Sequence, residues 1–456
     1  MARGKKTEKV LTPEEKLAQA LVPAEEQPYS VPENWCWVRL GSLGYTNIGL
    51  TYKPSDTSNK GTIVLRSSNI QDGQMDYEDI VKVDMDIPES KMSKSGDILI
   101  CARNGSKSLV GKTAIIDRDG MSYGAFMAIF RSPYNKLIYY YLNSHYFRNI
   151  IDSDVGTTTI NQVTQQLIKE LPFPLPPLAE QQRIVTRIES LFAKLDEAKE
   201  KAQAVVDSFE TRKAAILHKA FAGDLTVKWR LAQGIDIADW DTVILSDVCK
   251  INPPKVNTKD LPDDLEVSFF PMPALSEVYG EITEPQTKQL KEVRTGFTNF
   301  SEGDVVFAKI TPCMENGKSA IIGKLVNDIG FGTTEFYVLR CGDKLLNRYL
   351  YHIVRNQSFR DEAKSMMTGA VGQQRVPKGF LEQYPLCLPS VPEQKLIVQL
   401  LDNLIAKEQR ATEAAEAIID QIDTMKKAIL ARAFRGELGT NDPAEESAVE
   451  LLKSVL

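Results

Sequence analysis

The chain has 456 residues, of which 55 are Lys or Arg and 61 are Asp or Glu, so its formal net charge is −6. Hydrophobic residues make up 43% and charged residues 25%, which is typical of a soluble globular protein. At about 100–200 residues per domain, the length predicts about two to four domains. The acidic total argues against a protein that coats nucleic acid by bulk charge.

The chain begins with a polar lead. Residues 1–29 are rich in Lys and Glu, and a short helix is expected after Thr12-Pro13. Met1–Lys9 lacks the apolar segment of a secretory signal, and no apolar run approaches the roughly 18–20 residues of a membrane span. The six cysteines are scattered singly, which excludes a zinc ribbon and is typical of reduced thiols. We therefore expect a cytoplasmic protein without a metal site.

Residues 30–176 form the first predicted domain. Short β-rich runs such as Thr62–Arg66, Asp97–Ala102 and Ala125–Arg131 lie between Gly, Asn and Asp turn clusters, and residues 137–151 have a helical pattern. Strands followed by a helix and then by further strands favour an α+β domain over a doubly wound sheet.

Polar loops follow the predicted strands of this domain. No acidic residue lies between Asp97 and Asp117, so the cations in that stretch have no countercharge nearby in the sequence. Arg, Lys, Asn and Gln can contact base edges, and Ser, Thr and Lys suit phosphates. The candidate DNA contacts are Arg66, Asn69, Gln71, Arg103, Asn104, Ser106, Lys107, Lys112, Asn161 and Gln162. For any single residue, a solvated loop remains the alternative.

Residues 177–230 are predicted to form a long helix. From Ile184 to Phe209, apolar residues recur at alternating steps of four and three, and Ile216 follows seven residues later, a heptad seam that is typical of a helix paired with another helix. Gly223 stands where a C-terminal cap would end the helix. About 42 residues at about 1.5 Å each would make a rod about 60 Å long. The alternative is a surface helix that packs only on its own domain.

The second half of the chain repeats the first. A shift of 213 residues aligns Leu171–Leu225 with Tyr384–Leu438 without a gap, with 24 identities over 55 positions. Looser matches upstream predict a second α+β domain over residues 231–390, which is followed by a second helix over residues 391–438 with a polar break in its seam at Glu408.

Two long seams in one chain most simply pair with each other. Because the second domain follows the first helix, the second helix should run back antiparallel to it. This predicts a pseudo-twofold dumbbell of two like domains separated by two long coiled-coil helices, with residues 439–456 as a helical tail.

The polar loops recur at matching places in the second domain. The candidate DNA contacts there are Lys309, Thr311, Asn316, Lys318, Gln373, Gln374 and Arg375. Recurrence at the same place in both domains favours a function for the loops as a set.

Two motifs suggest an enzyme, but both are incomplete. Five residues separate Gly105 from Gly111, where a nucleotide-binding phosphate loop needs four. Residues 252–255 resemble the Asn-Pro-Pro-aromatic motif of amino-group methyltransferases, but Lys255 replaces the aromatic residue that would stack on a flipped base. The three histidines lie far apart, and no Ser-His-Asp signature is present. We therefore expect no catalytic residue on this chain.

Several segments resemble the specificity subunit of Type I DNA restriction-modification enzymes. The strongest is a proline-rich segment followed by Glu-Gln and a long helix, which occurs twice. The segments are Leu171–Ile184, its copy Tyr384–Ile397, Pro32–Trp35, Gly96-Asp97, Gly124–Phe126 and the glycine-led loops at residues 156 and 369.

The resemblance implies a non-catalytic subunit with two target recognition domains, each of which reads one half of a bipartite site in double-stranded DNA. It implies helices that set the spacing and dock two modification subunits, and we expect this role of Glu180, Gln181, Ile184, Leu191, Glu393, Gln394, Ile397 and Leu404. S-adenosylmethionine would then be bound by the modification subunits, which would methylate adenine. ATP and Mg would be bound by the restriction subunits, which translocate and cut DNA.

Two rival functions remain from the sequence. One is a coiled-coil adaptor that bridges two identical partners without recognising DNA. The other is a duplicated enzyme with a nucleotide or methyl-donor site near Gly111 or Asn252.

Overall fold

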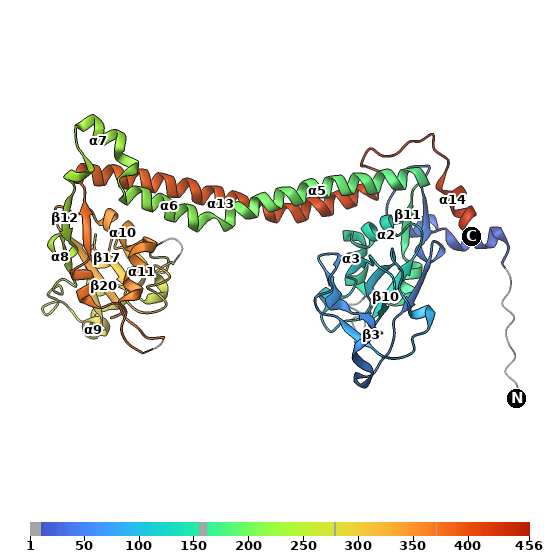
Figure 1. Cartoon of the computed structure of the whole chain (residues 1–456), viewed down its shortest axis with the longest axis horizontal. Helices are drawn as coiled ribbons and strands as arrows, with labels where there is room; N and C mark the ends of the chain where they lie inside the picture. Colours follow the sequence, from blue (N-terminus) through green and yellow to red (C-terminus); the bar gives the residue numbers. More distant parts are fainter. Residues whose placement is uncertain (1–10, 155–161, 278–279, 371) are drawn as a thin grey trace. The chain divides into compact units, whose positions relative to one another are not determined.

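The computed structural model describes residues 11–154, 162–277, 280–370 and 372–456. The chain divides into two compact units (Figure 1). The first unit contains residues 1–202 and 417–456, and the second contains residues 203–416. Each unit combines one α+β domain with part of a pair of long helices, which confirms the predicted fold class. No described helix is long and apolar enough to cross a membrane.

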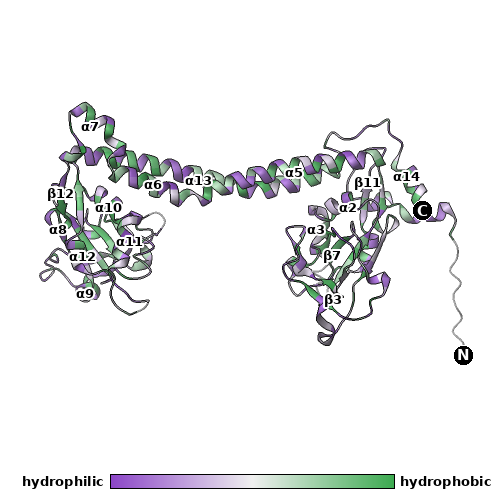
Figure 2. Cartoon of the chain, viewed as in Figure 1, coloured by the Kyte–Doolittle hydropathy of each residue, from purple (hydrophilic) through white to green (hydrophobic). Residues whose placement is uncertain are grey.

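The first domain is built on a four-stranded antiparallel sheet in the order β2-β10-β7-β8. Its strands are β2 (Tyr45–Ile48), β10 (Met127–Arg131), β7 (Ile98–Cys101) and β8 (Thr113–Ile115). Side chains of β7 alternate between two cores: Ile98 and Ile100 join one hydrophobic cluster, and Leu99 and Cys101 join another. Both faces of the sheet are therefore covered, which explains why β7 is apolar at every position (Figure 2).

Helices and a second sheet cover these two faces. The helices α2 (Asn135–Leu142) and α3 (His145–Asp154) contribute to the cluster that contains Ile98. The second sheet has the order β6-β3-β9, with β3 parallel to β9. Its strands, together with the adjoining hairpin, are β6 (Val81–Val83), β3 (Thr57–Leu65), β9 (Ser122–Tyr123), β4 (Ile70–Gln71) and β5 (Gln74–Met75).

The second domain repeats this plan. Its main sheet has the order β13-β20-β17-β18, antiparallel throughout, and its second sheet has the order β15-β14-β19-β16. The strands are β13 (Cys249–Ile251), β20 (Phe336–Cys341), β17 (Val305–Ala308), β18 (Ser319–Ile321), β15 (Gln286–Gln289), β14 (Glu266–Phe270), β19 (Gly330–Gly332) and β16 (Thr298–Phe300). The helices are α8 (Leu245–Val248), α9 (Leu290–Val293), α10 (Asn347–Arg355) and α11 (Gln357–Ser365).

Each domain begins and ends on one pair of antiparallel strands. In the first domain, β1 (Cys36–Arg39) pairs with β11 (Pro172–Leu175). In the second, β12 (Asp241–Ile244) pairs with β21 (Pro385–Leu388). Short helices, α4 (Gln165–Glu170) and α12 (Lys378–Glu382), lead into β11 and β21.

The long helices differ from each other in continuity. The first is divided into α5 (Leu178–Asp207) and α6 (Phe209–Phe221), whereas α13 (Val391–Ala433) is one element. The division falls at Ser208, whose hydroxyl donates to the carbonyl of Ala204 and accepts a hydrogen bond from the Arg212 guanidinium. Side-chain competition of this kind for backbone groups bends or interrupts helices.

Ion pairs show that the helices run antiparallel in the first unit. In the first unit, Asp196 pairs with Lys426 at 2.5 Å and Lys199 with Asp423 at 4.0 Å, so one residue number rises as the other falls. In the second unit, Glu408 receives the guanidinium of Arg212 at 2.6 Å. This pair explains the polar break in the predicted seam.

The predicted seam is wrong in the last part of α13. The apolar repeat of the second predicted helix places Ala415, Ile418, Ile422 and Met425 on the seam. Of these, Ile418 and Met425 are 47% and 46% exposed. Ala415 and Ile422 of the same predicted seam are buried, and Ile419 is half-buried, so the contact face keeps these two positions and takes up a neighbour of Ile418. A straight helix has about 3.6 residues per turn and drifts away from a strict heptad repeat, which accounts for the difference.

Shorter helices occupy both ends of the chain and the segment after α6. They are α1 (Pro13–Ala20), α7 (Val227–Gln233) and α14 (Ala448–Val455). Ala448 and Leu452 of α14 are fully buried in the core of the first unit, and the Lys16 ammonium donates to the carbonyl of Leu456 at 2.9 Å. Thr12 caps α1 through a capping box with Glu15, as its Thr-Pro start favours.

Candidate nucleic-acid interface

A buried ion pair fixes the start of the central strand in each domain. Asp97 lies before β7, is 1% exposed, and receives the Arg131 guanidinium at 2.6 and 2.5 Å. In the second domain, Asp304 lies before β17 and receives Arg340 at 2.7 Å on both carboxylate oxygens. The repeated Gly-Asp motif therefore has a structural role: it sets the position from which the strand and its following loop extend.

A second matched feature joins each domain to its helix. Glu180 is fully buried and accepts the indole N–H of Trp35 at 2.7 Å, and Glu393 accepts that of Trp240 at 3.0 Å. Gln181 donates to the carbonyl of Pro176, as Gln394 does to that of Pro389. These four side chains were expected to bind partner subunits, but the structure places them inside each unit, where they hold the domain to its helix.

The other residues expected to bind partners divide between core and helix pair. Ile184 and Ile397 are fully buried. Leu191 and Leu404 are half-buried along the helices. A partner that docks on the helices would therefore contact their exposed polar faces rather than this seam.

In the first domain, the loop after β7 is held against two other segments. The backbone N–H groups of Ala102 and Arg103 both donate to the carbonyl of Phe126, at 2.9 and 3.0 Å. The N–H of Val163 donates to the carbonyl of Ala102 at 2.7 Å, and Arg103 forms a β-bridge with Gln162. Three loops that lie far apart in the sequence therefore meet at the end of the central strand.

The second domain brings together the equivalent three segments. The N–H of Lys309 donates to the carbonyl of Glu335, and that of Val376 donates to the carbonyl of Lys309, both at 2.9 Å. Ile310 forms a β-bridge with Arg375, as Arg103 does with Gln162 in the first domain. These hydrogen bonds make Lys309, Ile310, Glu335 and Arg375 the structural equivalents of Ala102, Arg103, Phe126 and Gln162.

The candidates in residues 66–71 lie on an adjoining turn and differ in accessibility. Arg66 is half-buried and pairs with Asp79 at 2.7 Å, and Gln71 is exposed. Asn69 is fully buried; its amide donates to the carbonyls of Asp76 and Asp79 and accepts from the N–H of Arg66. Asn69 therefore holds the turn and does not offer its side chain to DNA.

The remaining candidates of the first domain lie on the loop after β7. Asn104 donates to the hydroxyl of Ser67, which ties this loop to the turn that contains Arg66. Ser106 and Lys107 are exposed, and the Lys107 ammonium donates to the carbonyl of Asp152. Lys112 is half-buried, and Asn161 lies outside the described residues.

In the second domain the candidates are joined more tightly. Thr311 and Gln374 are joined by two hydrogen bonds: the N–H of Thr311 donates to the carbonyl of Gln374, and the N–H of Gln374 donates to the side-chain hydroxyl of Thr311. Asn316 and Gln373 are exposed. The Lys318 side chain is 14% exposed and lies 3.6 Å from Glu277, so it faces inward rather than toward a ligand.

Two residues of these clusters were missed from the sequence. Phe126 and Glu335 each lie directly before a buried strand, so the sequence pattern assigns them to that strand. Phe126 is 61% exposed, with the Arg103 guanidinium 5.4 Å from its ring centre. Glu335 binds Arg375 through two hydrogen bonds of 2.9 Å, which lower the pKa of its carboxyl below the ordinary value. A Gly-x-Phe segment beside an acid-free loop was the available signal for Phe126.

The two enzyme-like motifs have structural roles. Residues 105–112 form a short turn that leads into strand β8 rather than a helix, so no helix N-terminus stands ready for a phosphate. The Lys255 ammonium donates to the carbonyl of Phe297 at 2.9 Å. Within the described residues, no group of three or more His, Cys, Asp or Glu side chains could hold a metal ion.

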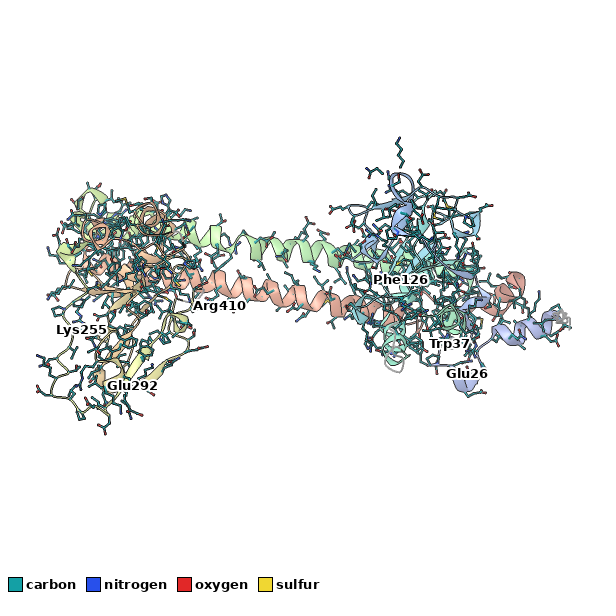
Figure 3. The ribbon with its side chains drawn as sticks, turned by 90° about the horizontal axis from the view of Figure 1, so that it is seen from below. Glu26, Trp37, Phe126, Lys255, Glu292 and Arg410 are labelled. Carbon is teal, nitrogen blue, oxygen red and sulfur yellow. The ribbon has the colours of Figure 1, made fainter. Side chains whose placement is uncertain are left out.

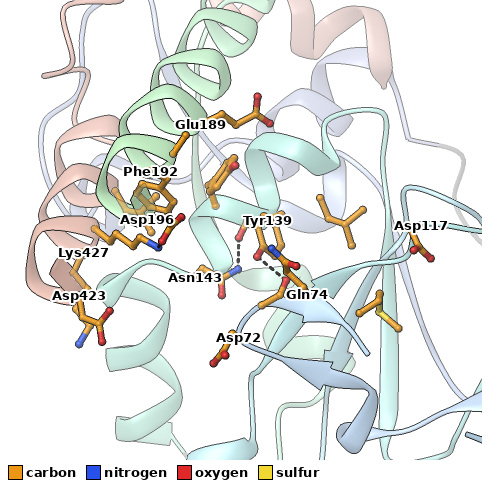
Figure 4. A pocket seen from close by; sticks show the side chains of 17 residues that line it. Asp72, Gln74, Asp117, Tyr139, Asn143, Glu189, Phe192, Asp196, Asp423 and Lys427 are labelled. Atoms are coloured by element: carbon orange, nitrogen blue, oxygen red, sulfur yellow. Dashed lines mark hydrogen bonds and ion pairs between the residues drawn. The ribbon is translucent and has the colours of Figure 1, made fainter. Parts of the chain in front are cut away.

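A cleft lies elsewhere in the first unit, between α2, the β4–β5 hairpin and the helices α5 and α13 (Figure 4). It holds about 780 Å³ and is lined by five carboxylates and two lysines. The carboxylates are Asp72, Asp117, Glu189, Asp196 and Asp423. Because such a surface repels phosphate, the polar loops remain the better DNA surface.

Comparison with known proteins agrees with this geometry. A family model for the Type I restriction modification DNA specificity domain matches residues 32–206 and 237–420. The chain is 36% identical over 258 residues to the EcoEI Type I restriction enzyme specificity subunit of Escherichia coli, a match that spans 47% of this chain and only 43% of that protein. It is 25% identical over 434 residues to the EcoKI specificity subunit of Escherichia coli strain K12, which covers 91% of both proteins.

A solved structure shares the fold. The HsdS subunit of Thermoanaerobacter tengcongensis superposes with a TM-score of 0.62 at 21% identity, over 90% of this chain and 99% of that one. The family model matches one copy of the repeat in each half of the chain and together covers most of its length. The chain therefore belongs to the family of Type I restriction-modification DNA specificity proteins.

Proposed function

We propose that this chain is the non-catalytic DNA-recognition subunit of a Type I restriction-modification complex. Each domain would read one half of a bipartite site in double-stranded DNA. The observation that carries the proposal is the pair of equivalent loop clusters, one at the end of each central strand, which combine guanidinium, amide and hydroxyl groups on the same backbone arrangement. Such groups are the ones that contact base edges and phosphates.

The contacts that we propose follow the placement of the side chains. Base contacts would come from exposed or half-exposed groups, and phosphate contacts from the lysines. In the first domain the residues proposed for both kinds of contact are Arg66, Gln71, Arg103, Asn104, Ser106, Lys107, Lys112 and Gln162. In the second they are Lys309, Thr311, Asn316, Gln373, Gln374 and Arg375. Asn69 and Lys318 would support the loops from within.

The chemistry would reside on partner subunits. We propose that two methyltransferase subunits, which bind S-adenosylmethionine, assemble with this chain and methylate adenine in the cytoplasm. Restriction subunits, where the host has them, would supply ATP- and Mg-dependent translocation and cleavage. The solvated outer faces of α5 and α13 support a docking role, since their carboxylates and lysines are largely exposed.

Methylation mapping tests this function. Modified adenines would be sequenced in host cells with and without this chain, and a bipartite motif should disappear on deletion. An unchanged set of methylated sites would refute DNA recognition and favour the adaptor function.

An exchange of domains tests the division of labour. Residues 36–175 would be replaced by the corresponding domain of another member of the family, and the methylated motif of the chimera would be mapped. One half of the motif should change and the other should persist. A change in both halves would contradict the proposal that each domain reads its own half.

A further inference from the structure

The two domains use the same backbone at the end of the central strand but different side chains. The carbonyl of residue 126 in the first domain and of residue 335 in the second accepts a hydrogen bond from the first residue after the strand, Ala102 or Lys309, at 2.9 Å. Elsewhere the copies keep the same residue at equivalent places, such as Asp97 and Asp304 beside Arg131 and Arg340.

At the loop positions this identity is lost. Arg103 corresponds to Ile310, Phe126 to Glu335, and Gln162 to Arg375. A common framework with divergent surface side chains is what two domains need if they read different base sequences. Residues 126 and 335 stand at the centre of this variation, because each contacts the arginine of its own cluster.

Phe126 presents an apolar surface among polar loops. Phe126 is 61% exposed, while its backbone is fixed by the hydrogen bonds from Ala102 and Arg103. Its place among the side chains of the first domain is labelled in Figure 3. The Arg103 guanidinium lies 5.4 Å from the ring centre and has no hydrogen bond or ion pair to any described residue. A single exposed apolar side chain is ordinary on a protein surface, but one whose backbone is fixed beside an arginine guanidinium can contact a base edge. In the major groove, the apolar feature of such an edge is the thymine methyl group.

Glu335 holds an arginine in a defined orientation. Arg375 donates Nε and Nη2 to the two carboxylate oxygens, and Nη1 to the carbonyl of Gln373 at 3.1 Å. Five N–H groups are available on a guanidinium, so one N–H on each terminal nitrogen remains unused by these contacts. Two such groups match the O6 and N7 acceptors of guanine.

We propose that residues 126 and 335 are equivalent specificity-determining positions, where Phe126 contacts the methyl group of a thymine and Glu335 positions Arg375 for a bidentate contact with guanine. The proposal rests on the DNA-recognition function proposed above and adds the residues and base features that set each half-site.

Removal of a single methyl group from DNA tests the role of Phe126. The full chain, assembled with the methyltransferase subunits of its host, would be bound to duplexes that carry the methylated motif, with each thymine of the half-site replaced in turn by uracil. Loss of one buried methyl should weaken wild-type binding about fourfold at one position. F126A should lose this difference between thymine and uracil at that position. M85A, which removes another exposed apolar side chain of the first domain, should keep it.

Three outcomes of that experiment are decisive. If F126A keeps the wild-type response to uracil at every position, Phe126 does not contact a methyl group. If binding instead unstacks a 2-aminopurine placed beside the site, in wild type but not in F126A, the ring inserts between bases and the methyl contact is refuted. If the wild-type complex does not prefer the motif over random DNA, the proposed function itself fails.

Removal of guanine N7 tests the role of Glu335. Replacement of one guanine by 7-deazaguanine should weaken wild-type binding about tenfold, and R375A should be insensitive to that change. E335Q should reduce the response to 7-deazaguanine, and E335D should restore part of it. E382Q, which removes a carboxylate from another pair with a cation in the second domain, should behave as wild type. An E335Q complex with an undiminished response would overturn the positioning role.

Discussion

At the scale of single residues, we expect the loop lysines to contribute to DNA binding differently from the loop arginines. The Lys107 ammonium is exposed and donates only to the carbonyl of Asp152, so its charge is not neutralised by a carboxylate in the described structure. Such a group contributes to DNA binding mainly by displacing counterions from a phosphate. It should therefore strengthen binding without selecting a sequence.

K107A tests this expectation. The complex should bind all sequences more weakly by a similar factor, and the slope of log K against log salt should become less steep by about 0.9. The measurement is a salt titration on duplexes with and without the motif. K201A, on the exposed face of α5, is the matched control. A change in sequence preference would show instead that Lys107 contacts a base.

His352 is a buried titratable residue in the second unit. It is 4% exposed, and its Nε2 lies 2.9 Å from Asp402, which also receives the Arg348 guanidinium. Burial lowers the pKa of the imidazole below its ordinary value of 6.5. For Asp402, burial raises the pKa, but the hydrogen bonds from His352 and Arg348 outweigh it and lower the pKa to about 2. Both pKa shifts agree with a neutral imidazole whose Nε2–H donates a hydrogen bond to the Asp402 carboxylate.

This pair predicts a pH dependence of stability. Below pH 6.5 the unfolded chain binds a proton at residue 352 that the folded chain does not, so the free energy of unfolding should fall as pH is lowered. The limiting slope for one proton is about 1.4 kcal/mol per pH unit. H352Q keeps an amide donor for Asp402 and should flatten the profile between pH 6.5 and 5 in urea titrations. An unchanged profile would show that other groups cause the dependence.

At the scale of elements, matched buried carboxylates join the helices to the domains. Glu180 accepts hydrogen bonds from Trp35, Thr440 and Asn441, all neutral donors. Glu393 accepts from Trp240, Thr226 and the buried guanidinium of Arg230. The segment after α13 thus completes the first unit in the way that the segment after α6 completes the second.

Replacement of these carboxylates should destabilise one unit at a time. E180Q turns an acceptor into a donor that faces other donors, which should cost the first unit about 2–3 kcal/mol. E393Q should cost the second unit about 3–5 kcal/mol, because it leaves Arg230 as a buried unpaired charge. Hydrogen exchange of β1–β11 and β12–β21 reports the two units separately. Equal loss of protection in both units after E180Q would contradict this account.

Sequence periodicity predicts elements better than it predicts surfaces. The 213-residue repeat and the heptad pattern indicate two like domains and two long helices, because both depend on spacing along the chain. The break at Ser208 depends on a side chain that competes for backbone hydrogen bonds, which the apolar pattern does not show. Similarly, the sequence predicts an accessible loop position for Asn69, and only the structure shows that its amide donates to the carbonyl of Asp79, ten residues later.

The candidate site was predicted in part for the same reason. Arg103 and Gln162 could be chosen by residue type, and the structure brings them together. Phe126 was not chosen, because a phenylalanine before a buried strand is usually part of the core. Only the fold shows that its ring points outward.

At the scale of the whole molecule, the net charge of −6 limits how this chain binds DNA. Local loops supply the cations, but the chain as a whole repels phosphate at long range. We therefore expect weak and strongly salt-dependent binding by the isolated chain and tight binding only with the methyltransferase subunits. Fluorescence anisotropy on the same duplex, with and without those subunits, measures the difference. Equal affinities would refute the expected dependence on partners.

The strand pairs β1–β11 and β12–β21 have a consequence for how new specificities arise. Because each pair is antiparallel, the entry and exit of the domain lie side by side, with paired Cα atoms about 5 Å apart. A domain with such ends can be exchanged as a unit. Genetic crossovers near residues 36–39 and 172–175 can replace it without moving the helix that follows. A host could therefore acquire a new half-site by recombination at two short stretches, while the assembly surface of the protein is inherited unchanged.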